Sequence, residues 1–286
     1  MNTYNDVYLK ARKKLRTAGI AAHDLEARLI VAHAAGKTRE ELLSQSRLFI
    51  PDNTIPAAVD TMIERRIAGE PVAYIVGEWD FFGLPLTVND KVMIPRVDTE
   101  VLAELAIKLM KQRGEKIRLL DICAGSGALG LAVAAHVPDC RVVLTDNSDR
   151  AVAICRVNML RNKLSRNVTA IVADALEMPP ALFGAFDAII SNPPYIPTGD
   201  IDSLDSSVKD YEPLAALDGG HDGLVFFRAI AGNWSAVLKQ GGYLAFECGV
   251  GQALAVRGIM EDSGFADIRT CTDTLGIDRV VLGIWK

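Results

Sequence analysis

The sequence has little of what metal centres, disulfide frameworks and membrane spans require. Its five cysteines are widely scattered, without a C-x-x-C pair, and only four histidines accompany them. We therefore expect neither a metal site nor disulfide bonds. Apolar runs of the roughly 20 residues that a membrane span needs are missing. The first residues also lack the apolar core of a signal peptide, which favours a cytoplasmic location.

Basic residues are scarce in the larger part of the chain. Residues 1–75 hold 11 Lys and Arg against 9 Asp and Glu, whereas residues 76–286 hold 20 against 27. Neutralisation of phosphate charge dominates non-specific nucleic-acid affinity, so an acidic main part is a poor match for a nucleic-acid backbone. We expect a monomer with no direct nucleic-acid substrate and no membrane association.

Three segments of the chain differ in pattern. Residues 1–73 show apolar positions at helical spacing, which predicts a small helical bundle. Residues 74–95 contain short aromatic and β-branched stretches between glycines and prolines, which predicts a β-hairpin linker. Residues 96–286 alternate strand and helix patterns, which predicts an α/β fold, a Rossmann-like sheet with helices on both faces. Of its seven expected strands, the last two are joined by a short turn, so they form a terminal antiparallel hairpin.

A glycine-rich turn follows the first of these strands. The stretch DICAGSGALG, residues 121–130, fits two ligand classes. Counted from its first glycine it matches G-x-G-x-x-G, which is typical of nicotinamide dinucleotide sites. Counted from its aspartate it matches D-x-x-x-G-x-G, which is closer to the turn that binds S-adenosylmethionine. In either case backbone N–H groups and the positive end of the next helix face the ligand. The residues of this turn are Cys123, Ala124, Gly125, Ser126 and Gly127.

Acidic residues end three successive strands of the predicted sheet. Asp121, Asp146 and Asp174 stand at the carboxyl ends of the strands, where ligands bind in an open α/β sheet. Asp146 is placed to accept hydrogen bonds from both ribose hydroxyls of a nucleoside, and Asp174 is placed to reach an adenine edge. Any one of them could instead cap the following helix. Three in succession favour a cofactor pocket.

The fourth strand runs directly into Asn-Pro-Pro-Tyr. Proline has no N–H, so this turn presents carbonyl oxygens without competing donors. The side-chain oxygen of Asn192 and the carbonyl of Pro193 can both accept from one planar NH2 group. Pro194 completes the turn, and Tyr195 provides a flat face beside the substrate. We assign these four residues to catalysis and substrate binding, with Asn192 also bordering the cofactor. Such a site suits an amide or an aromatic amine and offers nothing to hydride transfer, which favours S-adenosylmethionine over a nicotinamide.

Much of the chain resembles one family of methyltransferases. Asn-Pro-Pro-Tyr resembles the signature of S-adenosylmethionine-dependent enzymes that methylate planar nitrogens. The wider pattern is similar to the PrmC/HemK release factor glutamine methyltransferases. The matching segments are residues 69–74, 81–86, 94–100, the glycine turn, and residues 191–196, 211–217 and 278–282.

The resemblance implies a specific reaction. Members of this family transfer a methyl group to N5 of the glutamine in the Gly-Gly-Gln motif of class I peptide-chain release factors, and leave S-adenosylhomocysteine. We also expect the helical N-terminal domain to recognise the protein substrate, because the catalytic sheet alone presents only a cleft. The resemblance places Arg96 and Glu212 in substrate binding.

Two positions depart from the family pattern. Cys123 stands where many members have glycine, which is tolerated if the position needs only a small side chain. Ala175, which we still place beside the cofactor, stands where some members have an aromatic residue against the adenine. Two other functions stay open. One is an adenine-N6 methyltransferase acting on DNA or RNA, and the other is a non-catalytic protein that uses the fold as a docking platform.

Overall fold

The computed structural model describes residues 2–114 and 116–286, which form two compact units. The helical unit comprises Met1–Glu78 and Asp205–Tyr211, and the sheet unit comprises Trp79–Leu204 and Glu212–Lys286. Within the described chain, none of the helices is both long and apolar enough to cross a membrane.

The helical unit is a bundle, as the apolar spacing predicts. Capping boxes open two of its helices, because the side chains of Thr3 and Thr38 each accept a backbone N–H from three residues further on. A partly buried ion pair joins two others, with Arg66 Nε 2.7 Å from Glu26 Oε2. The helices are α1 (Tyr4–Thr17), α2 (His23–Ala34), α3 (Arg39–Ser44), α4 (Thr54–Ile67) and the short α5 (Val72–Val76).

One segment of the helical unit comes from much later in the chain. Residues 205–211 contain the short helix α9 (Ser206–Lys209). The hydroxyl of Tyr211 donates to the carbonyl oxygen of Ala68 at 3.1 Å. The helical unit is therefore assembled from two separate stretches of sequence.

The predicted hairpin is present but shorter than its predicted segment. Strands β1 (Glu78–Phe81) and β2 (Leu84–Thr87) pair in a two-stranded sheet. The two residues between them, Phe82 and Gly83, have φ angles of +49° and +77°, as a tight hairpin turn requires. Tyr74, which the pattern places at the start of the hairpin, instead lies in α5. That helix ends at Gly77, which takes the left-handed conformation with φ +72°.

A seven-stranded sheet confirms the predicted fold class. Its strands lie in the order β5-β4-β3-β6-β7-β9-β8. The pairs are parallel except those of β9, which runs antiparallel to β7 and β8. Successive strands run outward from β3 and then restart at β6 on its other side, which opens a crevice at the carboxyl ends of these two strands. The strands are β3 (Ile117–Ile122), β4 (Cys140–Asp146), β5 (Val168–Val172), β6 (Phe186–Ser191), β7 (Leu238–Glu247), β8 (Phe265–Thr272) and β9 (Asp278–Trp285).

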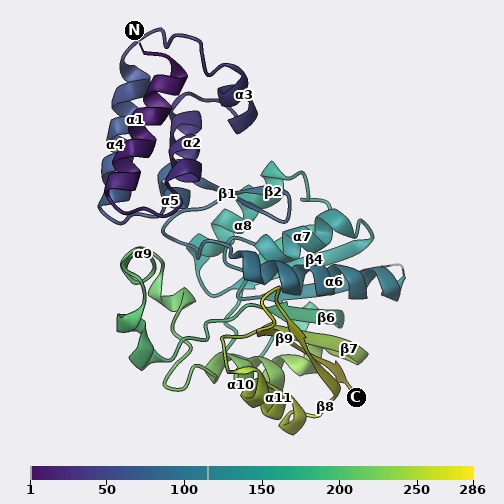
Figure 1. Ribbon diagram of the computed structural model, residues 1–286. Helices are drawn as coiled ribbons and strands as arrows, with labels where there is room; N and C mark the ends of the chain where they lie inside the picture. The colour runs from purple at the N-terminus through teal and green to yellow at the C-terminus, as the bar shows by residue number, and fades with distance from the viewer. Residues whose placement is uncertain (1, 115) are drawn as a thin grey trace. The chain divides into compact units, whose positions relative to one another are not determined.

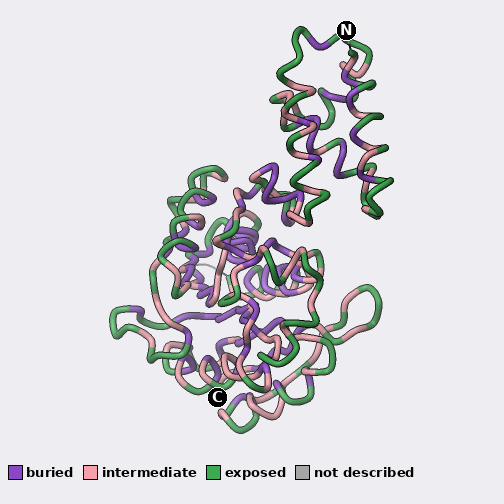
Figure 2. Tube along the Cα trace, turned by 90° about the vertical axis from the view of Figure 1, so that its left-hand side faces the viewer, coloured by how far each residue is buried: buried purple, intermediate pink, exposed green. Residues whose placement is uncertain are grey.

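Helices cover both faces of this sheet (Figure 1). One face carries α6 (Glu100–Arg113), α7 (Ala128–His136) and α8 (Asp149–Arg161), and the other carries α10 (Val225–Asn233) and α11 (Ala253–Asp262). Every residue of the central strand β6 is buried, as expected for a strand covered on both faces. Figure 2 shows the buried residues gathered in the middle of the sheet unit, with the connecting loops exposed.

Helix α7 approaches the sheet closely at Gly130. A Cβ added to this glycine would lie 2.3 Å from Leu144 Cδ2 and 2.9 Å from Val142 Cγ1. The N–H of Gly130 also donates to Asp121 Oδ2 at 2.8 Å. This last glycine of the motif therefore sets both the distance between helix and strand and the position of a carboxylate in the site.

We expect Gly130→Ala to lower the free energy of unfolding by about 1–3 kcal/mol, the usual cost of overpacking a filled core. Gly232→Ala is the matched control in α10, because no described atom lies within 4 Å of the added Cβ. It should be neutral, or stabilise by up to about 1 kcal/mol through helix propensity. Chemical denaturation measures both variants, and equal stabilities would contradict the close packing at Gly130.

Candidate active site

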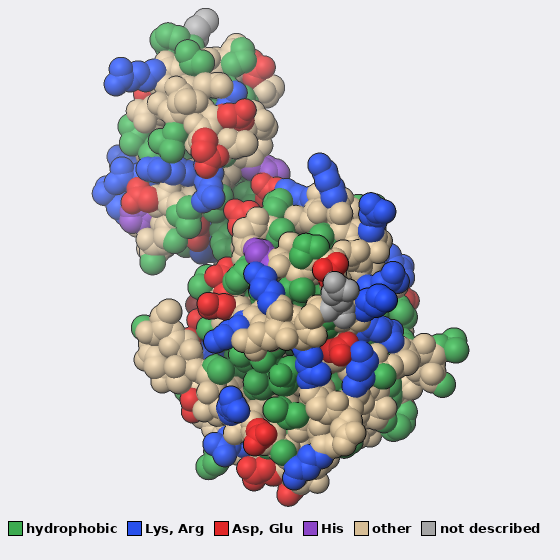
Figure 3. Space-filling view, turned by 90° about the vertical axis from the view of Figure 1, so that its right-hand side faces the viewer, with side chains coloured by type: hydrophobic (Ala, Val, Ile, Leu, Met, Phe, Trp, Pro, Cys, Tyr) green, Lys and Arg blue, Asp and Glu red, His purple; other side chains and the backbone are tan. Residues whose placement is uncertain are grey.

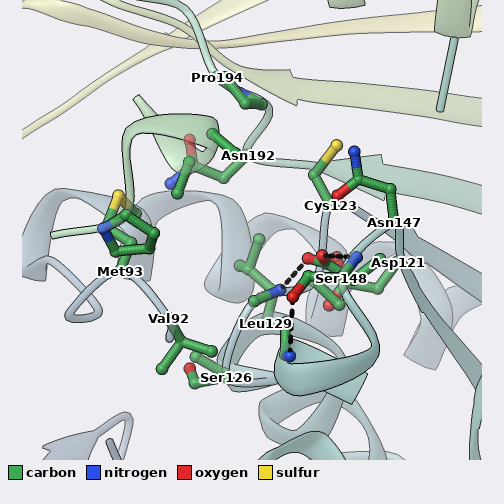
Figure 4. Close-up of a pocket in the computed structure, with 18 of the residues that line it drawn as sticks. Val92, Met93, Asp121, Cys123, Ser126, Leu129, Asn147, Ser148, Asn192 and Pro194 are labelled. Atoms are coloured by element: carbon green, nitrogen blue, oxygen red, sulfur yellow. Dashed lines mark hydrogen bonds between the residues drawn. The ribbon is translucent and has the colours of Figure 1, made fainter. Parts of the chain in front are cut away.

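A pocket opens at the carboxyl ends of β3, β4 and β6 (Figure 4). It brings together nine of the residues that the sequence assigns to the site. These are Asp121, Cys123, Ala124, Gly125, Ser126, Asp146, Ala175, Asn192 and Pro194. The described residues that line it do not include six others from the same assignment. These are Gly127, Asp174, Pro193, Tyr195, Arg96 and Glu212.

The glycine turn is built from left-handed residues. Cys123, Gly125 and Gly127 have φ angles of +60°, +55° and +83°. Glycine adopts this conformation freely, whereas a residue with a Cβ is strained there by roughly 1–2 kcal/mol. The departure at Cys123 therefore concerns the backbone as well as the size of the side chain, which corrects the expectation that a small side chain is sufficient.

Two carboxyl groups, those of Asp121 and Asp146, accept hydrogen bonds from backbone N–H groups of the glycine-rich stretch, residues 121–130. Asp121 is fully buried, and its Oδ1 has no hydrogen-bond partner within residues 2–114 and 116–286. Asp146 Oδ2 accepts from the N–H of Gly125 at 2.9 Å, and its Oδ1 accepts from the N–H of Ser148 at 3.0 Å. Burial raises the pKa of both groups, that of Asp121 to about 7. Asp146 thus fixes the turn itself, and its remaining lone pairs are available to a ligand.

The third acidic residue, Asp174, is not among the described residues that line the pocket, contrary to the expectation from the sequence. Ala173 and Ala175 line the pocket, while Asp174 between them lies outside the described lining. Its Oδ1 accepts from the N–H of Leu176 at 2.9 Å within a turn, and no helix of the described chain begins there for it to cap. An aromatic residue that the sequence pattern missed, Phe226 of α10, lines the pocket instead.

Asn192 stands beside the glycine turn. The register of β3 against β6 pairs Ile122 with Ser191, so Cys123 and Asn192 reach the pocket from neighbouring strand ends (Figure 4). Asn192 Nδ2 donates to Thr99 Oγ1 at 3.2 Å, which leaves Oδ1 as an acceptor. An amide acceptor and a carboxylate-supported glycine turn therefore share one cavity.

Comparison with known proteins agrees with this geometry. The family model "Methyltransferase small domain" matches residues 96–204, and "PrmC N-terminal domain" matches residues 6–77. The release factor glutamine methyltransferase of Clostridium acetobutylicum is 35% identical over 279 residues, 98% of this chain and 97% of that protein. The chain belongs to the release factor glutamine methyltransferase family. The enzyme of the same name from Geobacter sulfurreducens is 42% identical over 227 residues, 79% of this chain and 78% of that protein.

A solved structure supports the fold of this methyltransferase. The methyltransferase from Pyrococcus furiosus matches with a TM-score of 0.53 at 19% identity, covering 79% of this chain and 98% of that chain. At this identity the match shows the fold alone.

The Asn-Pro-Pro-Tyr turn of the enzyme is held by elements that the sequence pattern did not reveal. A Cβ on Gly223 would lie 2.4 Å from the carbonyl oxygen of Tyr195, and one on Gly219 would lie 2.7 Å from Tyr195 Cα. The same carbonyl accepts from Gln252 Nε2 at 2.8 Å. Only glycine at positions 219 and 223 leaves room for the backbone of Tyr195, so the loop at residues 218–223 packs directly against the turn.

Arg96 and Glu212 pair with each other. The Arg96 guanidinium donates to the Glu212 carboxylate, which is buried and also accepts from the N–H of Ile94 at 3.4 Å. Burial raises the pKa of Glu212, and Arg96 opposes the rise. The neighbours Pro95 and Pro213 both line the pocket. The ion pair therefore holds together two segments of the pocket wall.

Stability should depend on pH through Asp121. Burial raises its pKa from 3.8 to about 7, so the folded state binds this proton more tightly than the unfolded state does. The free energy of unfolding should therefore fall as pH rises from about 4 to about 7, by at most about 1.4 kcal/mol per pH unit for this one proton. Asp121→Asn retains an acceptor for Gly130 and should remove this part of the slope. Denaturation curves across this range test it, and an unchanged slope in the variant would rule out the raised pKa.

Proposed function

We propose that this enzyme methylates N5 of the glutamine in the Gly-Gly-Gln motif of class I peptide-chain release factors, with S-adenosylmethionine as methyl donor. The observation that carries the proposal is the Asn192 amide, which follows a buried strand, lines the pocket and is held through Nδ2 by Thr99. The names of the relatives, release factor glutamine methyltransferases, support the same substrate. Release factors act in translation, which makes a cytoplasmic location part of the proposal.

The pocket fits S-adenosylmethionine. The buried and unpartnered Asp121 Oδ1 suits the amino group of the methionine part. The lone pairs that Asp146 retains suit the ribose hydroxyls. The backbone at Gly125 leaves room for a ligand, because no described atom beyond its neighbours lies within 4 Å of an added Cβ. When bound, S-adenosylmethionine supplies an electrophilic methyl group.

The adenine wall is assigned to Phe226. Ala175 is too small to cover a purine ring, and Phe226 and Leu129 both line the same pocket. An aromatic ring offers a flat apolar face to a base. Some family members have an aromatic residue at the Ala175 position for this contact, and here Phe226 takes its place.

Orientation supplies most of the catalysis in this proposal. An amide nitrogen is a poor nucleophile because its lone pair is delocalised into the carbonyl group. Holding it in line with the methyl–sulfur bond lowers the barrier by roughly 7–11 kcal/mol. Asn192 Oδ1, in the pocket lining, and the carbonyl of the next residue, Pro193, which lies outside the described lining, accept the two amide protons and favour the nitrogen as it becomes pyramidal. The nitrogen–carbon bond forms as the carbon–sulfur bond breaks, S-adenosylhomocysteine is released, and the proton leaves to water.

The remaining members of the predicted site act around this centre. Tyr195 flanks the substrate, and burial raises its pKa to about 12, so its phenol stays neutral. Arg96 and Glu212 contribute to substrate binding indirectly, because their ion pair holds two segments of the pocket wall in place. Both roles belong to the proposal.

The adenine-N6 alternative is not favoured. Residues 76–286 carry 20 basic against 27 acidic residues, whereas a nucleic-acid substrate calls for a positive surface. The face shown in Figure 3 carries both kinds of charge on the sheet unit, with Lys and Arg gathered over its upper right part and Asp and Glu among them.

Asn192→Asp tests the acceptor role. The change keeps volume and an acceptor oxygen but removes the NH2 donor to Thr99 and adds a charge. We expect kcat to fall by about two orders of magnitude, the cost of misaiming a reacting group by about 1 Å, while the affinity for S-adenosylmethionine changes far less. Single-turnover methylation at saturating release factor measures the chemical step. Turnover near that of the wild type would leave Asn-Pro-Pro-Tyr as a structural turn.

The helical unit is proposed to grip the release factor. Three large apolar side chains close together in its sequence are more than half exposed, with Leu43 at 57%, Leu48 at 56% and Phe49 at 64%. Deleting residues 1–75 is a poor test, because it removes Ala68, the hydrogen-bond partner of Tyr211. Single surface substitutions avoid this damage.

Phe49→Ala should raise KM for the intact release factor about fivefold or more, since truncating an interface aromatic typically costs over 1 kcal/mol of binding. The kcat and the affinity for S-adenosylmethionine should stay unchanged. Leu182→Ala is the control, because this side chain in the sheet unit is 98% exposed and should have no effect. An unchanged KM after Ala substitution at all three apolar positions, Leu43, Leu48 and Phe49, would refute a docking role for them.

A further inference from the structure

A buried carboxyl lies behind the Asn192 amide. Glu247 is the last residue of β7 and is 2% exposed. The register of β6 against β7 pairs Ser191 with Phe246, so Asn192 and Glu247 follow side by side at the same edge of the sheet. Glu247 Oε2 has no hydrogen-bond partner among the described residues. An unpaired buried carboxyl oxygen is costly to the fold, so its presence here calls for a functional explanation.

Thr99 connects this carboxyl to Asn192. The Thr99 hydroxyl accepts from Asn192 Nδ2 at 3.2 Å and keeps a proton of its own to donate. Burial raises the pKa of Glu247, and hydrogen bonds from Thr99 and from Asn192 oppose that rise. Both side chains therefore face the carboxyl group.

We propose that Glu247 is a positioning residue that sets the orientation of the Asn192 side chain, acting through Thr99 and the amide NH2. The oxygen and the NH2 of an amide have nearly the same size, so packing alone does not choose between the two orientations related by a half-turn. An ionised carboxylate can only accept hydrogen bonds. It selects the orientation in which NH2 faces Glu247 and Oδ1 faces the pocket.

The opposite orientation would be unproductive. It would aim N–H donors at a substrate NH2 group that is itself a donor, and both would stay unpaired away from water. Glu247 thereby makes this part of the pocket an acceptor site for N–H groups. The inference rests on the proposed function, in which Oδ1 accepts from the glutamine amide.

The device is sensitive to pH. Burial raises the pKa of Glu247 to about 7. Below that pH the carboxyl gains a proton and becomes a donor, so its selection of the Asn192 orientation weakens. The kcat should therefore fall as pH decreases through about 7. The titratable and charged groups that act on Glu247 or respond to it are Asp98 of the 3-10 turn η1 (Val97–Thr99), Tyr195 after β6, Cys248 after β7, and Arg279 on β9.

Glu247→Gln separates positioning from structural support. The variant removes a buried ionisable group at constant size, so its stability near pH 8 should equal or exceed that of the wild type. We expect kcat near pH 8 to fall at least about tenfold, with both KM values within about threefold and no decline of kcat between about pH 8 and pH 6. Asp187→Asn is the matched control, since this buried carboxyl pairs with Lys239 at the other end of β6 and should leave the pH profile unchanged. Wild-type kcat with an intact pH decline in Glu247→Gln would overturn the proposal.

Thr99 provides a second and independent pair of variants. Thr99→Val keeps the shape but removes the hydroxyl that links the two groups, so kcat should fall to a similar extent. Thr99→Ser retains the hydroxyl and should recover most of the loss. Equal kcat in the valine and serine variants would show that the hydroxyl does not carry the orientation.

A readout without substrate distinguishes this inference from the proposed function. The side-chain NH2 resonances of Asn192, followed by NMR in the free protein, should titrate with a midpoint near pH 7 and should stop doing so in Glu247→Gln. That result would support the link between Glu247 and Asn192 even if release factors were not methylated. If the Asn192 resonances of the wild type do not change with pH, the inference is overturned, even if release factors are methylated.

Discussion

The parallel pairing of β3 with β6 is the constraint on which the site depends. Its last matched residues are Ile122 and Ser191, and the Ser191 hydroxyl donates to the Ile122 carbonyl at 2.6 Å. The residues that follow the two strands, Cys123 and Asn192, therefore lie side by side at the carboxyl edge of the sheet. A slip of one residue would turn every side chain of the strand to the opposite face. The cofactor turn and the amide acceptor would then no longer share a cavity.

Two buried carboxyl groups at the site lower the stability of the fold. Asp121 and Glu247 are 0% and 2% exposed, and each has one oxygen without a partner in the described chain. Apolar side chains of similar size would suit such positions better in a protein optimised for stability alone. One carboxyl lies under the glycine turn and the other lies behind Asn192. Their costs are thus tied to the two halves of the proposed transfer, which place the methyl donor and orient the acceptor.

Sequence patterns predicted most of the sheet unit because strand and helix periods are local. They also predicted the glycine turn and Asn192, which stand next to strand ends that the same periods define. They did not reveal Thr99, Glu247 or Phe226, because each reaches the site through pairing and packing between distant segments. Asp174 was placed in the pocket by analogy between strand ends, yet its carboxylate is engaged by Leu176. The helical unit also includes residues 205–211. This is a long-range association that local sequence patterns do not encode.

The acceptor chemistry of the pocket is only part of the specificity. In the proposed mechanism Asn192 Oδ1 and the Pro193 carbonyl accept from a planar NH2 group, and an adenine amine presents the same two protons as a glutamine amide. Discrimination between them must therefore come from surfaces outside the acceptor site. The acidic balance of residues 76–286 disfavours a phosphate backbone. The exposed apolar side chains of the helical unit, such as Phe49, favour a protein partner. In this proposal the pocket selects the reacting group, and the surrounding surfaces select the molecule that carries it.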